Sequence, residues 1–449
     1  MKMISINGDL KASMINSLWR VFAGPVMLLA IPFFLTPMEQ GYWYTFTGLA
    51  ALSIFADLGF TGIVLQFAAH EFAYLKFEGN RRLTGDADHL WRLASFFRFT
   101  VRWLMKVVLI VFPVIMVGGY FFIAGKHDDI VWQRAWYLYS LASAIAFCDS
   151  AFLSFFEGCN SVKLLQSVRF RIGVFTTCTN LVCLSLGLNL YALALSQSVN
   201  ATMGAVYICW YFRKTIGQLW LLSKDKCYNW WPEFSSLIWR YAISWCSGYF
   251  IFQLFTPLAF YFHGAVFSGK VGISIAMWTA GSGIANTWIT AILPKMNMLI
   301  SKRNWKELDY IFHKSLVRSI LTMAVGGAAY FIIYAIFHDK FSFFQRVLDP
   351  FNMGMLYISW ILQTWVNLIA AYLRAHKKEP LMFLSAIGGA WVGITTLLCA
   401  KYLPEEYMFL GFLSQYITIP FIVRIYKHQK DEHLKLLPLD EHDSTKKLK

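Results

Sequence analysis

Charged residues are scarce in this chain. Only 14% of its 449 residues are Asp, Glu, Lys or Arg, whereas 57% are hydrophobic and 18% are aromatic. A soluble protein of this composition would expose large apolar patches, but lipid can cover the apolar exterior of a membrane protein. The scarcity of charge therefore excludes an ordinary soluble domain and predicts a polytopic membrane protein.

Signatures of catalysis are also missing. The sequence contains no GxSxG, HExxH, P-loop or glycine-rich dinucleotide motif. Its eight cysteines have no zinc-site spacing with histidine and lie outside the predicted outer loops, so we expect neither a disulfide framework nor a metal site. We interpret the protein as a non-enzyme without a cofactor. Because an ATPase motif is absent, active transport would have to draw on H⁺, Na⁺ or the gradient of the substrate itself.

Long apolar runs dominate the chain instead. No cleavable signal peptide is expected, because the first run starts near Ser13 and continues past signal-peptide length without a small-x-small site. Crossing a membrane takes about 20 apolar residues. Twelve predicted spans meet this requirement: 13–36, 41–69, 100–124, 134–157, 167–187, 190–212, 238–262, 265–294, 316–337, 351–373, 380–400 and 404–425.

The positive charges lie almost entirely on one side of these spans. Of the 40 basic residues, the other side holds only Lys126, Arg134, Lys270, Lys340, Arg346 and Lys401. The positive-inside rule therefore predicts cytoplasmic N- and C-termini. The net charge of +15 is then explained by orientation and by membrane lipids, not by nucleic acid. All outer loops are short, which leaves no room for the outer substrate domain of a membrane glycosyltransferase.

The layout predicts two similar halves. We expect an N-terminal six-helix lobe over 1–212, a cytoplasmic loop over 213–237, a C-terminal six-helix lobe over 238–426 and a polar cytoplasmic tail over 427–449, predicted to be disordered. An even number of spans per half makes this a parallel repeat. The inner segments 69–99 and 213–239 mix basic and aromatic residues and predict short interfacial helices. Two parallel lobes suggest a rocking transporter with a cavity between them.

Two carboxylates lie within the predicted spans. Asp57, in the string "SIFADLGF", is deep in the second span, where an ionised carboxylate needs a partner, water or a proton. It is either a proton-coupling or cavity residue, or a packing residue beside Gly59 and Gly62, which allow close helix approach. Asp149 lies in the inner half of the fourth span, which is rich in serine, and we interpret it as a cavity or partner contact.

Two arginines open the two halves at matching positions. Arg20 follows Trp19 at the start of the first span, and Arg240 follows Trp239 at the start of the seventh. Facing inward, they would form a cationic entrance for a phosphate group. Facing outward, they would snorkel to lipid headgroups. The sequence leaves both readings open.

Three segments carry a family resemblance. The string Glu39-Gln40-Gly41-Tyr42-Trp43-Tyr44 follows the first span, "DLGF" at 57–60 lies in the second, and "LPKMNMLISKRNWKELDYIF" at 293–312 leaves the eighth. Together with the span layout, these segments resemble the polysaccharide-transporter (Wzx-type) branch of the multidrug/oligosaccharidyl-lipid/polysaccharide (MOP) exporter superfamily.

The resemblance implies a fold and a function. The fold would be an all-α, MATE/MOP-like bundle of about 12 transmembrane helices in two parallel lobes. The function would be a flippase of the bacterial plasma (inner) membrane that moves a polyprenyl-diphosphate-linked oligosaccharide by alternating access. The product would be O-antigen of lipopolysaccharide or capsule, and glycosyltransferases and a polymerase would be partners. In this resemblance Asp57 matches the family element, whereas the arginines are inferred from position alone.

Two alternatives remain open on the sequence. One is an ion-coupled exporter of drugs or other small molecules in the same superfamily. The other is a membrane-embedded glycosyl- or acyltransferase.

Overall fold

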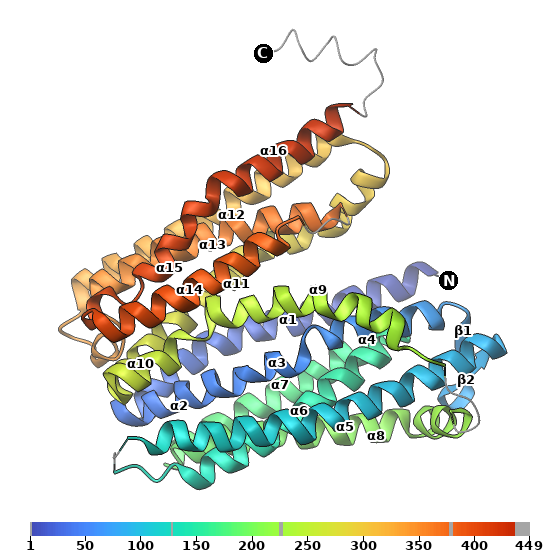
Figure 1. The fold of residues 1–449 in the computed structure, drawn as a ribbon, viewed down its shortest axis with the longest axis horizontal. Coiled ribbons are helices and arrows are strands. Elements are labelled where there is room, and N and C mark those ends of the chain that lie inside the picture. Colours follow the sequence, from blue (N-terminus) through green and yellow to red (C-terminus); the bar gives the residue numbers. More distant parts are fainter. Residues whose placement is uncertain (1, 127–128, 224–227, 377–379, 436–449) are drawn as a thin grey trace. The chain divides into compact units, whose positions relative to one another are not determined.

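The computed structural model describes residues 2–126, 129–223, 228–376 and 380–435. Apart from one hairpin, the regular structure of these residues is helical (Figure 1). The chain divides into two compact units, Met1–Ile273 and Ser274–Lys449. The two predicted six-helix lobes, 1–212 and 238–426, have other boundaries than these units, and their existence as a repeat stays a prediction.

Unit 1 contains most of the helices. Its elements are α1 (Lys2–Phe34), α2 (Pro37–Ala50), α3 (Ile54–Asp57), α4 (Phe60–Phe72), β1 (Leu75–Glu78), β2 (Arg82–Gly85), α5 (Ala87–Ala124), α6 (Gln133–Gly158), α7 (Val162–Ser185), α8 (Leu190–Leu222), α9 (Trp231–Phe252), α10 (Phe255–His263) and the first turns of α11 (Ala265–Ser301). Helix α6 packs against α4, α5 and α8, and α7 packs against α1 and α8. These contacts form one helix bundle, in which α6 runs parallel to α4 and α8 and antiparallel to α5.

Unit 2 contains the remainder of α11 and the C-terminal helices. These are α12 (Trp305–Phe337), α13 (Pro350–Ala375), α14 (Met382–Tyr402), α15 (Leu410–Ser414) and α16 (Ile419–Lys435). Helix α13 packs against α12, α15 and α16. Residues 436–449 of the predicted tail lie outside the described residues, and the predicted disorder is wrong as far as Lys435, where α16 ends.

The helices agree with the predicted membrane spans. Within the described residues, seven helical segments are long and apolar enough to cross a membrane, and two bent helix pairs raise this number to nine. The other three predicted spans are α7, α8 and α11, which are also long helices but contain more polar residues. The prediction of an all-α polytopic membrane protein is therefore confirmed.

The segments predicted as interfacial helices form other structures. Residues 75–85 form the antiparallel hairpin β1–β2, in which Leu75 pairs with Gly85 and Glu78 with Arg82. The string "HLWRLASFFRF" is the start of α5, which begins after Asp86. Backbone amides of His89 and Asp88 donate to the Asp86 carboxylate and hold its pKa below its ordinary value. Likewise, α8 continues to Leu222. The segments 87–99 and 213–222 therefore extend the helices of the third and sixth predicted spans.

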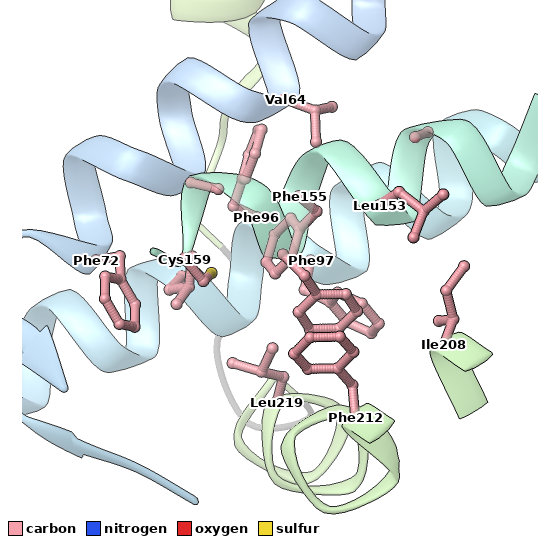
Figure 2. Close-up of a cluster of buried hydrophobic side chains, with 14 of the residues drawn as sticks. Val64, Phe72, Phe96, Phe97, Leu153, Phe155, Cys159, Ile208, Phe212 and Leu219 are labelled. Carbon is pink, nitrogen blue, oxygen red and sulfur yellow. The ribbon is translucent and has the colours of Figure 1, made fainter. Parts of the chain in front are cut away.

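An aromatic core closes unit 1 at the end that carries the hairpin. We call this the basic end, because α4, α6 and α8 end there and Arg81, Lys163 and Arg171 lie there. The core combines side chains of α4, α5, α6 and α8, including Val64, Phe96, Phe155 and Phe212 (Figure 2). Phe156 and Phe212 stack with ring centroids 3.9 Å apart. Burial of these aromatic rings contributes much of the apolar area that stabilises unit 1 at this end.

The motif at 39–44 places α2 against the beginning of α11. Gln40 donates from Nε2 to the carbonyl oxygen of Gly269 at 2.8 Å, and the hydroxyls of Thr45 and Ser268 lie 3.0 Å apart. A Cβ atom at Gly41 would overlap the carbonyl group of Ala265. Glycine is therefore required here by close helix packing, which explains this part of the motif.

Gly41→Ala should lower the free energy of unfolding by about 1–3 kcal/mol, because the backbone of α11 cannot move aside as a flexible side chain could. Gly24→Ala is the matched control, since Gly24 lies in α1 with no atom within 4 Å of its built Cβ. Alanine there should be neutral or stabilising. Thermal unfolding of the purified protein in detergent measures both. Equal melting temperatures for the two variants would contradict the packing argument.

Candidate transport site

Asp57 is the last residue of α3 and lies directly before a break in the second span. Leu58 and Gly59 have left-handed backbone, with φ of 47° and 78°, and the chain restarts as α4 with a bend of 43°. Asp57 is 9% exposed. Its Oδ1 accepts from the backbone N–H of Thr61 at 3.1 Å, and its Oδ2 from the Thr61 hydroxyl at 3.1 Å.

This geometry explains why a carboxylate lies in an apolar run. The first amides of a restarted helix have no intrahelical partner, and in a membrane an unpaired amide costs several kcal/mol. A carboxylate at a helix N-terminus satisfies such an amide and is also favoured by the helix dipole. Asp57 therefore caps α4. Whether it also contacts a transport cavity stays a prediction.

The two glycines after Asp57 differ in role. A Cβ at Gly59 would lie 2.7 Å from Cβ of Tyr241 in α9, so this glycine provides both the left-handed turn and a close helix contact. Gly62 has no atom within 4 Å of its built Cβ. The prediction of close approach is thus confirmed for Gly59 and wrong for Gly62.

The cap predicts different effects for two substitutions of Asp57. Asp57→Ala removes the acceptor and should cost about 1 kcal/mol of unfolding free energy, whereas Asp57→Asn keeps an acceptor oxygen for Thr61 and should remain near wild type. The melting temperature of the purified protein measures this difference. Equal destabilisation by Ala and Asn would contradict capping, and a loss of transport in stable Asp57→Asn would show that the charge has a second role.

Asp149 faces helix α8 from α6 and is 7% exposed. A Cβ built on Gly204 would lie 2.5 Å from Asp149 Oδ2, so the glycine makes room for the carboxylate. This oxygen has no hydrogen-bond partner among the described residues. A buried ionised carboxylate with an unsatisfied oxygen costs several kcal/mol in a membrane, so the side chain requires a proton, a cation or water.

The predicted site residues are not assembled into one cluster. Asp57 is engaged at the α3–α4 break and Asp149 at the α6–α8 contact, and within the described residues no hydrogen bond joins them. Arg20 is exposed on α1, beside Trp19, which packs on Phe170. Arg240 lies in α9, and its side chain is outside what the structure describes. Both readings of the arginines stay open.

A buried acid at the basic end was missed by the sequence reading. Glu71, at the end of α4, is 1% exposed and accepts at Oε2 from His89 Nδ1 at 2.8 Å. Its Oε1 lies 3.2 Å from Arg92 Nη2. The Arg92 guanidinium also covers the ring of Tyr228 at 4.8 Å. This cluster connects α4, α5 and the segment before α9. In the sequence, Glu71 could have been noticed as an acidic residue at the end of an apolar run.

A series of polar side-chain contacts connects helices α1, α7 and α6. Asn16 donates to Gln166 at 2.9 Å, Gln166 donates to Glu157 at 2.9 Å, and Arg169 Nη1 lies 2.8 Å from Glu157 Oε2. Glu157 also lines a cavity of about 600 Å³ at the basic end, between α4 and the α6–α7 turn. Both carboxylate oxygens of Glu157 have a partner. We therefore interpret these contacts as structural links between the helices.

Pairs of uncharged polar side chains contact one another inside unit 2. The hydroxyls of Ser282 and Thr364 lie 3.0 Å apart between α11 and α13, and the Tyr416 hydroxyl donates to Gln363 at 3.0 Å. Such groups can bind hydroxyl-rich or neutral polar ligands but supply no fixed charge.

Comparison with known proteins gives the fold. No family model matches the chain, and no curated protein sequence matches it. Among solved structures, an inward-facing multidrug resistance MATE family transporter of the MOP superfamily is similar with a TM-score of 0.61 and 12% identity, covering 92% of this chain and 99% of that chain. The eukaryotic MATE transporter AtDTX14 is similar with a TM-score of 0.53 and 14% identity, covering 96% and 95%.

A third similar structure limits what the fold implies. A MOP superfamily transporter from Pyrococcus furiosus has a TM-score of 0.53 and 9% identity over 95% of this chain and 96% of that chain, and its reversed binding-pocket polarity is described as suggesting a different function. The MATE/MOP-like fold predicted for this chain is therefore confirmed, and the proteins that share it are transporters, not enzymes. The cargo is not fixed by the fold.

Proposed function

We propose that the protein is a flippase that moves a polyprenyl-diphosphate-linked oligosaccharide repeat unit from the inner to the outer leaflet by alternating access. The proposal that the protein is an exporter rests on its MATE-like fold. The similarity to the inward-facing MATE family transporter extends over 92% of this chain and 99% of that chain. The cargo part rests on the resemblance of the segments at 39–44, 57–60 and 293–312 to Wzx-type transporters.

The two motifs of unit 1 support the resemblance through their structural roles. "DLGF" is the point at which the second span breaks and restarts under the Asp57 cap. The string at 39–44 supplies the glycine that lets α2 contact α11 closely. A motif used for backbone geometry is a better family marker than a chance string of apolar residues, because few residue types satisfy such positions.

The charged residues receive separate roles in this proposal. Asp149 is the coupling acid, because its unsatisfied oxygen needs a proton or cation such as H⁺ or Na⁺. Asp57 shapes the second span near the transport path. Arg20 and Arg240 attract the diphosphate at the inner entrance, whereas the sugar crosses and the polyprenyl chain remains in lipid.

The setting of the proposed function is the bacterial plasma (inner) membrane. Glycosyltransferases on the inner side would supply the repeat unit, and a polymerase on the outer side would consume it to make O-antigen or capsule. Membrane lipids surround the apolar helices. The predicted outer loop around His338 to Pro350 is short, so polymerisation would require a separate protein.

An exporter of drugs is the second candidate. Two of the similar structures are described as multidrug resistance transporters, in inward-facing and outward-facing conformations. The pairs of uncharged polar side chains inside unit 2 would also suit neutral or weakly polar molecules. This candidate predicts drug efflux without any effect on glycan precursors.

A deletion strain distinguishes the two candidates. Loss of the flippase should cause lipid-linked repeat units of unchanged mass to accumulate on the inner leaflet, with normal drug susceptibility. Re-expression of the chain should reverse the accumulation. Increased sensitivity to cationic drugs with normal surface glycan would favour the drug exporter, and precursors of altered mass would favour a transferase.

A further inference from the structure

A basic cavity lies entirely within unit 1, at its basic end. It has a volume of about 460 Å³ and is bounded by the hairpin, the α6–α7 turn, the first turns of α7 and the end of α8. Its lining residues are Phe77, Arg81, Asn160, Ser161, Lys163, Leu164, Ser167, Arg171 and Phe212. Three of these are cations and none is acidic, so the cavity is complementary to an anion.

The cationic groups are held in position by the surrounding structure. Arg81 donates from Nη1 to the carbonyl oxygen of Tyr211 at 3.1 Å, and its guanidinium carbon lies 4.6 Å from the Tyr211 ring centre. The Arg171 guanidinium lies beside the hydroxyls of Tyr207 and Tyr211 and interacts with them electrostatically. Phe212, behind them, belongs to the aromatic core (Figure 2). Fixed guanidinium groups bind phosphate oxygens with little loss of entropy.

The hairpin that carries Arg81 is itself attached to α8. Gln218 accepts at Oε1 from the Leu83 amide at 2.9 Å and donates from Nε2 to the Leu83 carbonyl at 2.8 Å. Thr215 donates to the carbonyl oxygen of Arg81 at 2.7 Å. The mouth of the cavity is therefore a built feature and not a loose arrangement of surface lysines.

An apolar groove continues from the same tyrosines. Tyr207 and Tyr211 also line a depression of about 480 Å³ along α8, together with Thr202, Met203, Val206 and Trp210. Val206 is 60% exposed and Trp210 is 76% exposed. The groove lies in the predicted sixth span, 190–212, where such side chains face hydrocarbon. A ligand with a phosphate at one end and acyl chains at the other would fill the cavity and the groove together.

We propose that this surface, the cavity with the α8 groove, binds one anionic glycerophospholipid. The phosphate contacts Arg81, Lys163 and Arg171, and the acyl chains lie along Val206 and Trp210. Basic pockets beside transmembrane helices on the cytoplasmic side are known to hold such headgroups. None of the residues that line the proposed site is among those given a role in transport, Asp57, Asp149, Arg20 and Arg240. The site does not depend on the proposed cargo.

The test is native mass spectrometry of the full-length protein in detergent. Phosphatidylglycerol and cardiolipin are titrated, with phosphatidylcholine as the zwitterionic reference. The variant K163Q/R171Q should bind the anionic lipids about 25-fold more weakly, since each basic residue near a phosphate contributes about five-fold. The matched control R213Q/K214Q removes two exposed charges from the same end of α8 but not from the cavity, and should bind as wild type.

Two competitors distinguish the sources of phosphate. Inorganic phosphate at millimolar concentration should not displace the lipid, and farnesyl diphosphate should displace it no better than phosphatidylglycerol does. Displacement by inorganic phosphate would indicate a soluble-anion site and overturn the proposal. Preferential displacement by farnesyl diphosphate would assign the site to the transport substrate and also overturn it.

Loss of lipid binding in both K163Q/R171Q and R213Q/K214Q would show that binding depends only on the total positive charge. It would contradict a specific site. If K163Q/R171Q does not fold, K163Q alone replaces it, because Lys163 is exposed. That variant should show about a five-fold weaker interaction with anionic lipid. Unchanged lipid binding in a folded variant would overturn the proposal.

Discussion

Glu71→Ala should lower the free energy of unfolding by about 3–5 kcal/mol, the largest stability effect that we expect for a single polar residue in unit 1. The carboxylate is 1% exposed, and its oxygens are engaged by His89 at 2.8 Å and Arg92 at 3.2 Å. Removal of the carboxylate leaves two half-buried side chains, Arg92 at 30% exposure and His89 at 23% exposure, without their acidic partner. Thermal unfolding in detergent and the monodisperse yield measure the loss.

A double-variant cycle separates the ion pair from simple burial. Glu71→Gln leaves Arg92 uncompensated, whereas E71Q/R92Q removes both charges, so the double variant should lose less stability than the sum of the single ones. Glu78→Gln, on the exposed side of β1, is the matched control and should be neutral. Strictly additive losses would show that the two charges do not interact.

Asp149→Asn should reduce export at least about tenfold, equivalent to about 1.4 kcal/mol or more, with unchanged abundance in the membrane. Asparagine has a similar volume and fits the space beside Gly204, but it cannot bind and release a proton or balance a cation. The loss should therefore appear in transport and not in folding. Export of the repeat unit, normalised to protein in the membrane, is the measurement.

The control and the complementary variant both follow from the α6–α8 contact. Glu406→Gln removes an exposed acid outside this contact and should leave export unchanged. Gly204→Ala would place a Cβ atom 2.5 Å from Asp149 Oδ2, so the carboxylate must move and export should fall again. Normal export by folded Asp149→Asn would exclude Asp149 as the coupling acid.

The spans could be predicted because their signal is local. An apolar run of sufficient length must cross the membrane as a helix, since only a helix satisfies its own backbone there. The break at Leu58 was not predicted, because Phe55 and Phe60 on either side continue the apolar run. Its signal was present all the same: Gly59, inside the apolar run, is a residue that commonly ends a helix in a left-handed conformation.

The interactions between distant residues could not be predicted. Glu71 and Arg92 are on different helices, and the partner ring of Tyr228 comes from the segment before α9. Only the fold brings these positions together. The contact of Asp149 with Gly204 has the same origin, because a glycine on α8 has meaning only once α8 lies against α6. The hairpin β1–β2 overrode a composition that favoured an interfacial helix, since Gly79-Asn80 provides a turn.

The most direct test of the central claim is transport by the purified protein in vesicles. Proteoliposomes contain a fluorescent polyprenyl-diphosphate oligosaccharide in their membrane. A glycosidase that cannot cross the membrane is added outside, so it cleaves labelled lipid of the inner leaflet only after that lipid has moved to the outer leaflet. The account predicts rapid cleavage of all labelled lipid with the wild-type protein and slow cleavage with Asp149→Asn. Equal and slow cleavage with the wild-type protein and with empty vesicles, while a cationic dye is exported, would contradict it.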